Sequence, residues 1–179
     1  KAASRMEVKI DSPDPNTHAG EIICRGTNLM LGYYKNPEAT AQIIDKDGWL
    51  HTGDLGTMDN QGYVTIRGRS KNLLLNSSGH NIYPEEIESK LNNMLYVSES
   101  LIVLQNDKLV ALIYPDFDEA FANGLQQPDI EKAMENNRIE LNLQLPSYSQ
   151  ITKVKIHFEE FEKTAKKSIK RFMYQEAKG

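Results

Sequence analysis

The sequence predicts an α+β protein made of two unlike parts that meet close to residue 70. Before that point, short alternating segments are separated by turns rich in Gly, Asp and Asn, which is typical of a small β-sheet or barrel. Beyond it, apolar strand-like segments and helical segments that begin at proline predict a compact unit with a small sheet flanked by helices. A chain of 179 residues suits one domain or two small ones.

The first part contains four segments with strand character. Residues 6–10 and 20–26 come first, and the loop between them is rich in Ser, Pro, Asp, Asn and Gly. A short helix is expected to open at Asn36-Pro37-Glu38-Ala39-Thr40. Residues 49–56 and the alternating strand 63–67 follow, with a turn between them. These strands constitute the predicted small sheet or barrel.

The second part begins with a short apolar strand at residues 73–75, followed by a polar loop and a helix predicted from Pro84 to Leu95. Proline suits the first turn of a helix, because its missing N–H would have no partner there. Two glutamates follow in the same turn, where negative charge suits the positive end of the helix dipole. Ile87, Leu91 and Leu95 recur at helical spacing and predict one apolar face.

The rest of the second part predicts a hairpin, two helices and a last strand. Strands are expected at residues 100–105 and 108–114, and Asn106-Asp107 between them is a hairpin turn signal. The remaining predicted elements are a helix at 128–143, a strand at 153–158 and a final helix at 166–174 in a highly charged tail.

Composition excludes several classes of function. A net charge of −4 and a pI near 5.6 give no argument for binding nucleic acid. No apolar run approaches the roughly 20 residues that a membrane span needs, and no cluster of Cys and His predicts a metal site. The single cysteine, Cys24, fits a reducing cytoplasm. The chain does not begin with Met, so we expect it to be cut from something longer.

A joint pattern in the middle of the chain resembles a known family. It combines Gly68-Arg69-Ser70-Lys71, the short apolar strand, Gly79, Ile82, Pro84 and Glu86-Ile87-Glu88. Together these residues resemble the hinge and following loop of the AMP-forming adenylating enzymes. That superfamily includes acyl-CoA synthetases, the adenylation domains of peptide synthetases, and luciferases.

The resemblance covers nearly the whole chain. Residues 20–40 are similar to the small β-barrel segment of the family, and Trp49-Leu50-His51-Thr52-Gly53-Asp54 is similar to its ribose-binding motif. Fatty acyl-CoA synthetases are the nearest group, on the basis of Gly32-Tyr33-Tyr34-Lys35-Asn36-Pro37-Glu38-Ala39-Thr40 and Ile169-Lys170-Arg171-Phe172-Met173-Tyr174. The resemblance implies a chain that is part of an acyl-CoA synthetase.

The resemblance also implies a division into domains. Residues 1–70 would be the C-terminal end of the large AMP-binding domain, and residues 71–179 the mobile C-terminal α+β domain. The phosphate loop of the family and its aromatic Thr-Glu segment, which holds adenine and Mg²⁺, do not occur in these residues. We therefore expect the ATP phosphates and Mg²⁺ to be held mainly by a missing N-terminal part, and this piece alone to be incompetent in catalysis.

Asp54 and Arg69 are the predicted ribose-binding residues. A carboxylate accepts two hydrogen bonds, which matches the paired 2′ and 3′ hydroxyls of a ribose. Arginine offers a fixed fork of donors, and the matching arginine of the family reaches the ribose and phosphate side of the nucleotide. Without the resemblance, Gly53-Asp54 reads as a turn and Arg69 as half of a surface salt bridge, which is worth little.

Lys71 and the loop Ser78-Gly79-His80 are predicted to serve the domain movement and CoA. By resemblance, Lys71 is the hinge, where two domains swing on the dihedral angles of one residue. In the family, the loop lines the channel for the pantetheine arm of CoA, and a glycine without Cβ permits close approach. The plainer alternatives are a solvated lysine and a glycine that only makes a turn.

The tail resembles the segment that carries the adenylation lysine of the family. The usual form is Lys-Thr-x-x-Gly-Lys-Ile-x-Arg, and alignment on Lys163-Thr164 and Ile169-Lys170-Arg171 places Ser168 at the lysine position. A lysine is wanted there because negative charge builds on the carboxylate and the α-phosphate. The hypothesis is that Lys167 replaces it, with Lys166 and Lys170 as alternatives.

These features together predict an acid–CoA ligase, part of an enzyme that joins a carboxylic acid, expected to be a fatty acid, to AMP with ATP and Mg²⁺ and transfers the acyl group to CoA. The partners expected are these small molecules and the missing N-terminal domain. The enzyme would be cytoplasmic, free or peripheral to the membrane. Two alternatives remain open: an adenylation domain that loads a carrier protein, and a non-catalytic interaction domain on the same fold.

Overall fold

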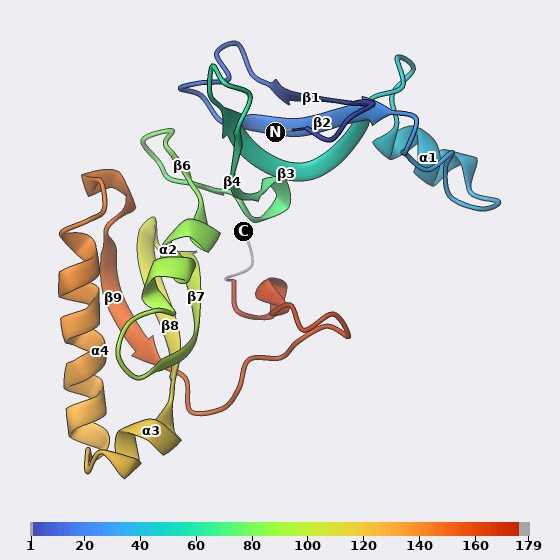
Figure 1. The fold of residues 1–179 in the computed structure, drawn as a ribbon. Helices are drawn as coiled ribbons and strands as arrows, with labels where there is room; N and C mark the ends of the chain where they lie inside the picture. The colour runs from blue at the N-terminus through green and yellow to red at the C-terminus, as the bar shows by residue number, and fades with distance from the viewer. Residues whose placement is uncertain (1, 176–179) are drawn as a thin grey trace. The chain divides into compact units, whose positions relative to one another are not determined.

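The computed structural model describes residues 2–175, which divide between Asn72 and Leu73 into two compact units (Figure 1). The first unit is built on an antiparallel sheet in the order β1-β2-β3-β4. Its elements are β1 (Met6–Asp11), β2 (Gly20–Gly26), α1 (Pro37–Ile43), β3 (Leu50–Met58), β4 (Val64–Arg69) and the 3-10 turn η1 (Ser70–Asn72).

The first unit contains the predicted sheet rather than the barrel alternative. Among the described residues, β1 and β4 are its two edges and do not pair with each other. Trp49 is buried beside the sheet, with the Lys9 ammonium 4.0 Å and the Arg25 guanidinium 4.6 Å from its ring centre. Gly56 lies where β3 shifts register against β4, and a Cβ there would stand 2.6 Å from the Thr65 carbonyl oxygen. Glycine is needed at this close approach of two strands.

The second unit is an α+β arrangement around the sheet β7-β8-β9, in which β7 and β8 are antiparallel and β8 and β9 are parallel. The predicted hairpin turn at Asn106-Asp107 joins β7 to β8, and both of its residues have positive φ, which is typical of two-residue hairpin turns. The elements are β5 (Leu74–Leu75), β6 (Asn81–Ile82), α2 (Pro84–Leu91), β7 (Val97–Gln105), β8 (Lys108–Pro115), α3 (Phe117–Ala122), α4 (Gln127–Asn142), the 3-10 turn η2 (Ser147–Ser149) and β9 (Ile151–Ile156).

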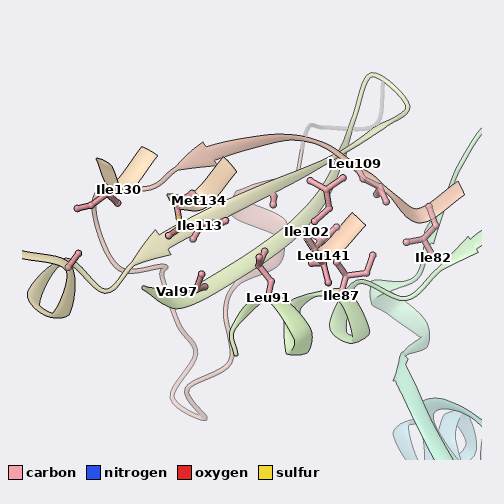
Figure 2. Close-up of a cluster of buried hydrophobic side chains, with 13 residues drawn as sticks. Ile82, Ile87, Leu91, Val97, Ile102, Leu109, Ile113, Ile130, Met134 and Leu141 are labelled. Carbon is pink, nitrogen blue, oxygen red and sulfur yellow. The ribbon is translucent and has the colours of Figure 1, made fainter. Parts of the chain in front are cut away.

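The main core lies between one face of this sheet and helices α2 and α4. Figure 2 shows Ile87 and Leu91 of α2, Met134 of α4, and Ile102 and Ile113 of the sheet gathered in one cluster. Each of these side chains is at most 3% exposed. Full burial of such a side chain stabilises the fold by about 1.5–3 kcal/mol, so this cluster supplies most of the driving force for folding of the unit.

The opposite face of the sheet is covered by the tail after β9. Leu101, Val103, Val110 and Leu112 form a second cluster there with Phe161, which is 2% exposed. Because both faces are covered, successive residues of β7 and β8 are buried. The two strands consequently read as continuous apolar runs instead of alternating ones.

Two predicted helical segments are corrected by the structure. Helix α2 ends at Leu91, and Leu95 is 70% exposed rather than part of an apolar face. The helix stops because asparagines follow it, and these side chains bond local groups in place of the helical pattern. Asn93 Nδ2 donates to the Ser89 carbonyl, and Asn92 Oδ1 accepts from the Ser100 hydroxyl.

The predicted final helix at residues 166–174 is also wrong. The tail forms an isolated antiparallel bridge between Lys163 and Ile169, followed by a short 3-10 turn, η3 (Arg171–Met173). Of its apolar side chains, Phe161 belongs to the second cluster, and Ile169 and Tyr174 pack against that cluster. Their spacing of eight and five residues does not suit one face of a helix, so packing against the sheet requires an extended chain.

Candidate functional site

Asp54 and Arg69 lie directly opposite each other in the first unit. The register of β3 and β4 pairs these two residues, and Arg69 Nη1 donates to Asp54 Oδ1 at 2.6 Å. The same nitrogen lies 3.4 Å from the Thr52 carbonyl oxygen. The side chain of Arg69 is 47% exposed and that of Asp54 is 33% exposed, so a ligand in solution has access to both charges.

The turn before Asp54 is held by hydrogen bonds to β2. Gly53 has a φ of +73° and donates its N–H to Glu21 Oε1 at 2.8 Å. The Thr52 hydroxyl donates to the Ile22 carbonyl at 2.7 Å and lies 3.1 Å from the Asp54 amide, whose hydrogen bond it accepts. These bonds tie the segment to the centre of the sheet, so that Asp54 is displayed from a fixed backbone.

His51 connects this turn to a second acidic side chain. Its Nδ1 lies 2.8 Å from Glu21 Oε2, and its Nε2 lies 3.6 Å from Asp45 Oδ2. The hydrogen bond to Glu21, supported by Asp45, raises the pKa of His51 against the opposing effect of partial burial. Glu21 therefore bonds both His51 and the Gly53 N–H, a link that sequence reasoning missed, although the acid in Gly20-Glu21 could have suggested it.

Lys71 is exposed in η1, which ends at Asn72, the last residue of the first compact unit. The predicted hinge residue thus lies one position before the boundary between the units. The role of Lys71 as a hinge stays a prediction.

Gly79 occupies a tight turn closed by Asn76. The Gly79 N–H donates to the Asn76 carbonyl at 3.0 Å, and Asn76 Oδ1 accepts from the amides of Ser78 and His80. Gly79 has a φ of +79°, and a Cβ there would meet no described atom within 4 Å. Within this chain, the glycine is needed for its backbone conformation rather than for a close contact.

The loop is anchored on both sides of its tip. Ser77 donates its amide to Asp107 Oδ1 at 2.8 Å, and its hydroxyl to the other oxygen of that carboxylate. These bonds lower the pKa of Asp107. The His80 ring stacks on Tyr148, with ring centres 4.6 Å apart and planes 7° from parallel. Ser78 and Gly79 remain exposed between the anchors.

The tail lysines surround a second tight turn. Lys167 donates its amide to the Thr164 carbonyl at 2.9 Å and has a φ of +60°, the left-handed conformation that glycine adopts most easily. Residue 167 is the position that aligns with the glycine of the family motif. Lys170 Nζ lies 3.4 Å from Glu162 Oε2. Lys166 and Lys167 are exposed, and neither forms an ion pair with the part of the chain that the structure describes.

Across residues 2–175, no group of three or more His, Cys, Asp or Glu is placed to hold a metal ion. None of the helices described is long and apolar enough to cross a membrane.

Comparison with known proteins decides the family. Residues 71–177, which are more than half of the chain, match the family model of the AMP-binding enzyme C-terminal domain. The chain belongs to this family. The suspected relation to the AMP-forming adenylating enzymes is confirmed by this match and by the relatives that follow.

Two curated relatives of this AMP-binding C-terminal domain protein are CoA ligases. The chain is 48% identical over 103 residues to a 3-[(3aS,4S,7aS)-7a-methyl-1,5-dioxo-octahydro-1H-inden-4-yl]propanoyl:CoA ligase of Rhodococcus jostii, a match to 58% of the chain and 19% of the relative. It is 33% identical to a 2-methylpropanoate–CoA ligase of Humulus lupulus, over 96% of the chain and 31% of the relative. The chain therefore spans less than a third of the length of either enzyme.

Solved structures show the same fold. The O-succinylbenzoate CoA synthetase of Bacillus subtilis, solved in complex with AMP, superposes with a TM-score of 0.78 over 99% of this chain and 35% of that one, at 23% identity. The predicted α+β fold class is thereby confirmed.

Proposed function

We propose that this chain is the C-terminal part of an AMP-forming acid–thiol ligase, which activates a carboxylic acid as acyl-AMP and transfers the acyl group to CoA. Residues 1–70 would end the large AMP-binding domain, and residues 71–179 would form the mobile domain. The observation that carries the proposal is the Asp54–Arg69 pair, which the register of β3 and β4 places together at an accessible edge.

The pair has the chemistry that a nucleotide ribose requires. The Asp54 carboxylate accepts hydrogen bonds from the paired ribose hydroxyls, and ionised acceptors form stronger hydrogen bonds than neutral ones. Arg69 orients that carboxylate through its fixed donor geometry and brings positive charge to the phosphate side of the nucleotide. The bonds of Glu21 and Thr52 to the preceding turn keep Asp54 in place.

The second unit would supply the residues that act on the acyl group. Lys167, with Lys166 as its alternative, brings an ammonium group to the negative charge that develops during acyl transfer to AMP. Lys71 is the hinge, and Ser78, Gly79 and His80 line the path of the pantetheine arm. ATP supplies the leaving group and CoA the thiol, while Mg²⁺ and the triphosphate are held mainly by residues that precede this chain.

We propose a fatty acid as the substrate. The support is the resemblance of residues 32–40 and 169–174 to fatty acyl-CoA synthetases. The relatives are named for varied acids, one with a fused-ring propanoyl group and one with the short, branched 2-methylpropanoate. Both kinds of acid therefore belong in any substrate panel.

The test is ATP–pyrophosphate exchange by the full-length enzyme with fatty acids of increasing length, 2-methylpropanoate and a fused-ring propanoate. We expect exchange with at least one fatty acid, and thioester formation with free CoA. The substitution Asp54→Asn should raise the KM for ATP. Exchange with none of the acids would contradict the proposal, and acyl transfer to a carrier protein but not to CoA would favour the carrier-loading alternative.

A further inference from the structure

The tail is fastened to helix α2 by a buried ion pair that joins residues 83 positions apart. Arg171 Nη1 donates to Glu88 Oε1 at 2.8 Å, and its Nη2 contacts Oε2 of the same carboxylate. The side chains are 15% and 10% exposed. This two-pronged geometry is the one in which an arginine restricts both position and orientation.

Glu88 also fixes α2 to the sheet. Its Oε1 accepts a hydrogen bond from the Ile102 amide at 2.7 Å, and Ile102 belongs to β7, an edge strand of the sheet. One carboxylate thus bonds the edge strand and the tail together. Burial raises the pKa of Glu88, while the Arg171 guanidinium opposes that rise. Without Arg171, a nearly buried carboxylate would lose its counter-charge, which is costly.

Arg171 adjoins both ends of the lysine-bearing turn. It follows the bridge between Lys163 and Ile169 by two residues, and the amide next to it, of Lys170, donates to the Glu162 carbonyl at 2.8 Å. Glu162 in turn donates its own amide to the Tyr174 hydroxyl at 2.8 Å. The residues on both sides of the turn at 164–168 are therefore linked to the segment of Arg171 by backbone hydrogen bonds and by the bond to the Tyr174 hydroxyl.

We propose that Arg171 is a positioning residue, which holds the Lys166-Lys167 turn in its place on the second unit through its paired hydrogen bonds to Glu88. The inference rests on the proposed function, because it concerns the delivery of a tail lysine for adenylation. The substitution Arg171→Lys would keep the positive charge and lose the forked pair of donors, so the turn would be tethered but not oriented. A misplacement of about 1 Å far from the chemistry costs on the order of 10²-fold in rate.

The first measurement is hydrogen exchange of the full-length enzyme, followed by mass spectrometry. Arg171→Lys and Glu88→Gln are each expected to accelerate exchange in the peptide covering residues 163–171, where the amides of Thr164 and Lys167 are bonded. Peptides from β8 should exchange as in the wild type. The matched control is Arg138→Lys, since Arg138 also forks onto a carboxylate, that of Glu135, in the same unit.

The second measurement separates the two partial reactions. Arg171→Lys should lower kcat for adenylation on the order of 10²-fold with a nearly constant KM for ATP, because a lysine that acts in the transition state contributes little to ground-state binding. Thioester formation from pre-made acyl adenylate should stay within about threefold of wild type. The double variant with Glu88→Gln should lose no more than the worse single variant, since the two residues act as one unit.

The outcomes distinguish the inference from the proposed function. Normal adenylation in both single variants would overturn the positioning role. So would an equal loss of both partial reactions together with a loss of thermal stability, if Arg138→Lys reproduces these losses. A wild-type enzyme without either partial reaction would overturn the proposed function and the inference with it.

Discussion

At the scale of single residues, the tail turn has an unusual backbone at Lys167, next to the serine that stands where the family motif has lysine. Lys167 has left-handed backbone geometry, with a φ of +60°, in the position that aligns with the glycine of the motif. A left-handed conformation costs a residue other than glycine about 1–2 kcal/mol. The chain therefore tolerates a strained lysine at the turn, which places an ammonium group one residue before Ser168.

We expect Lys167→Ala to slow adenylation by the full-length enzyme on the order of 10²–10³-fold, the typical loss of one transition-state contact. Thioester formation from pre-made acyl adenylate should stay near the wild-type rate. The measurement is ATP–pyrophosphate exchange alongside a thioester assay. Lys166→Ala is the matched control, because Lys166 is the exposed neighbour in the same turn. A normal Lys167→Ala enzyme with a slow Lys166→Ala or Lys170→Ala enzyme would assign the role elsewhere.

A second variant addresses the same turn from the opposite direction. The double change Lys167→Gly and Ser168→Lys restores both motif residues and removes the strained backbone. We expect it to adenylate at least as fast as wild type and to melt at a higher temperature. Loss of activity in this variant would show that the charge is needed at residue 167 itself.

His51 gives the first unit a predictable dependence on pH. Its pKa is raised in the folded state by Glu21 and Asp45, so folding favours the protonated imidazole. The resulting stability is fully present below the unfolded pKa, near 6.5, and is lost as pH rises through the folded pKa. The advantage of wild type over Glu21→Gln in melting temperature should accordingly be largest below about pH 6.5 and shrink above it. A constant difference between pH 5 and pH 9 would contradict this account.

At the scale of elements, a substitution in the loop at residues 76–80 should separate an effect on stability from an effect on thioester formation. A Cβ at Gly79 has open space, so Gly79→Ala should cost only backbone strain, about 1 kcal/mol. Gly124, after α3, is a matched control, because it has a φ of +80° and the same open surroundings. Chemical denaturation should show similar losses in both alanine variants. Only Gly79→Ala should slow thioester formation, and equal thioester rates in the two variants would refute the CoA role of the loop.

The elements that were predicted correctly are those with local signals. The β7–β8 hairpin follows from Asn106-Asp107, and α4 from Pro128 and the helical pattern after it. The elements that were missed depend on contacts distant in sequence. The tail is extended because Phe161 covers a sheet face that is distant in sequence. Leu95 matches a helical period that the side chains of Asn92 and Asn93 interrupt.

The candidate site follows the same division. Asp54 and Arg69 were found from motifs, and strand pairing then brought them together. Glu21, Asp45 and Glu88 were not found, because each acts by bonding a residue from another element. Their partners lie far away in the sequence, so local patterns mark at most the acid itself, as at Gly20-Glu21, and not the residue that it bonds.

At the scale of the whole molecule, the first unit exposes large apolar side chains close together in the sequence. Leu31, which is 103% exposed, lines an open depression together with Gly32 and Tyr33, and Tyr34, next in the sequence, is 88% exposed. Contiguous exposed apolar patches in proteins usually mark contact surfaces. The chain spans less than a third of the length of two CoA-ligase relatives. We propose that another part of the same polypeptide covers the exposed side chains of Leu31 and Tyr34.

The burial of the two units predicts that they differ in stability when separated. In the second unit, Leu91, Ile102, Ile113 and Met134 are 0% exposed, whereas the most deeply buried hydrophobic side chain described in the first, Ile10, is 5% exposed. A protein of residues 72–179 retains both faces of the β7-β8-β9 sheet covered and should unfold in one cooperative thermal transition followed by circular dichroism. A protein of residues 1–68 keeps the exposed apolar patch and a thin core, and small domains with little buried surface are marginal, so it should show no such transition at 25 °C or above. An unfolded spectrum from residues 72–179 would place the boundary of the folding unit elsewhere, and a cooperative transition from residues 1–68 would show that the first unit does not need the chain before it.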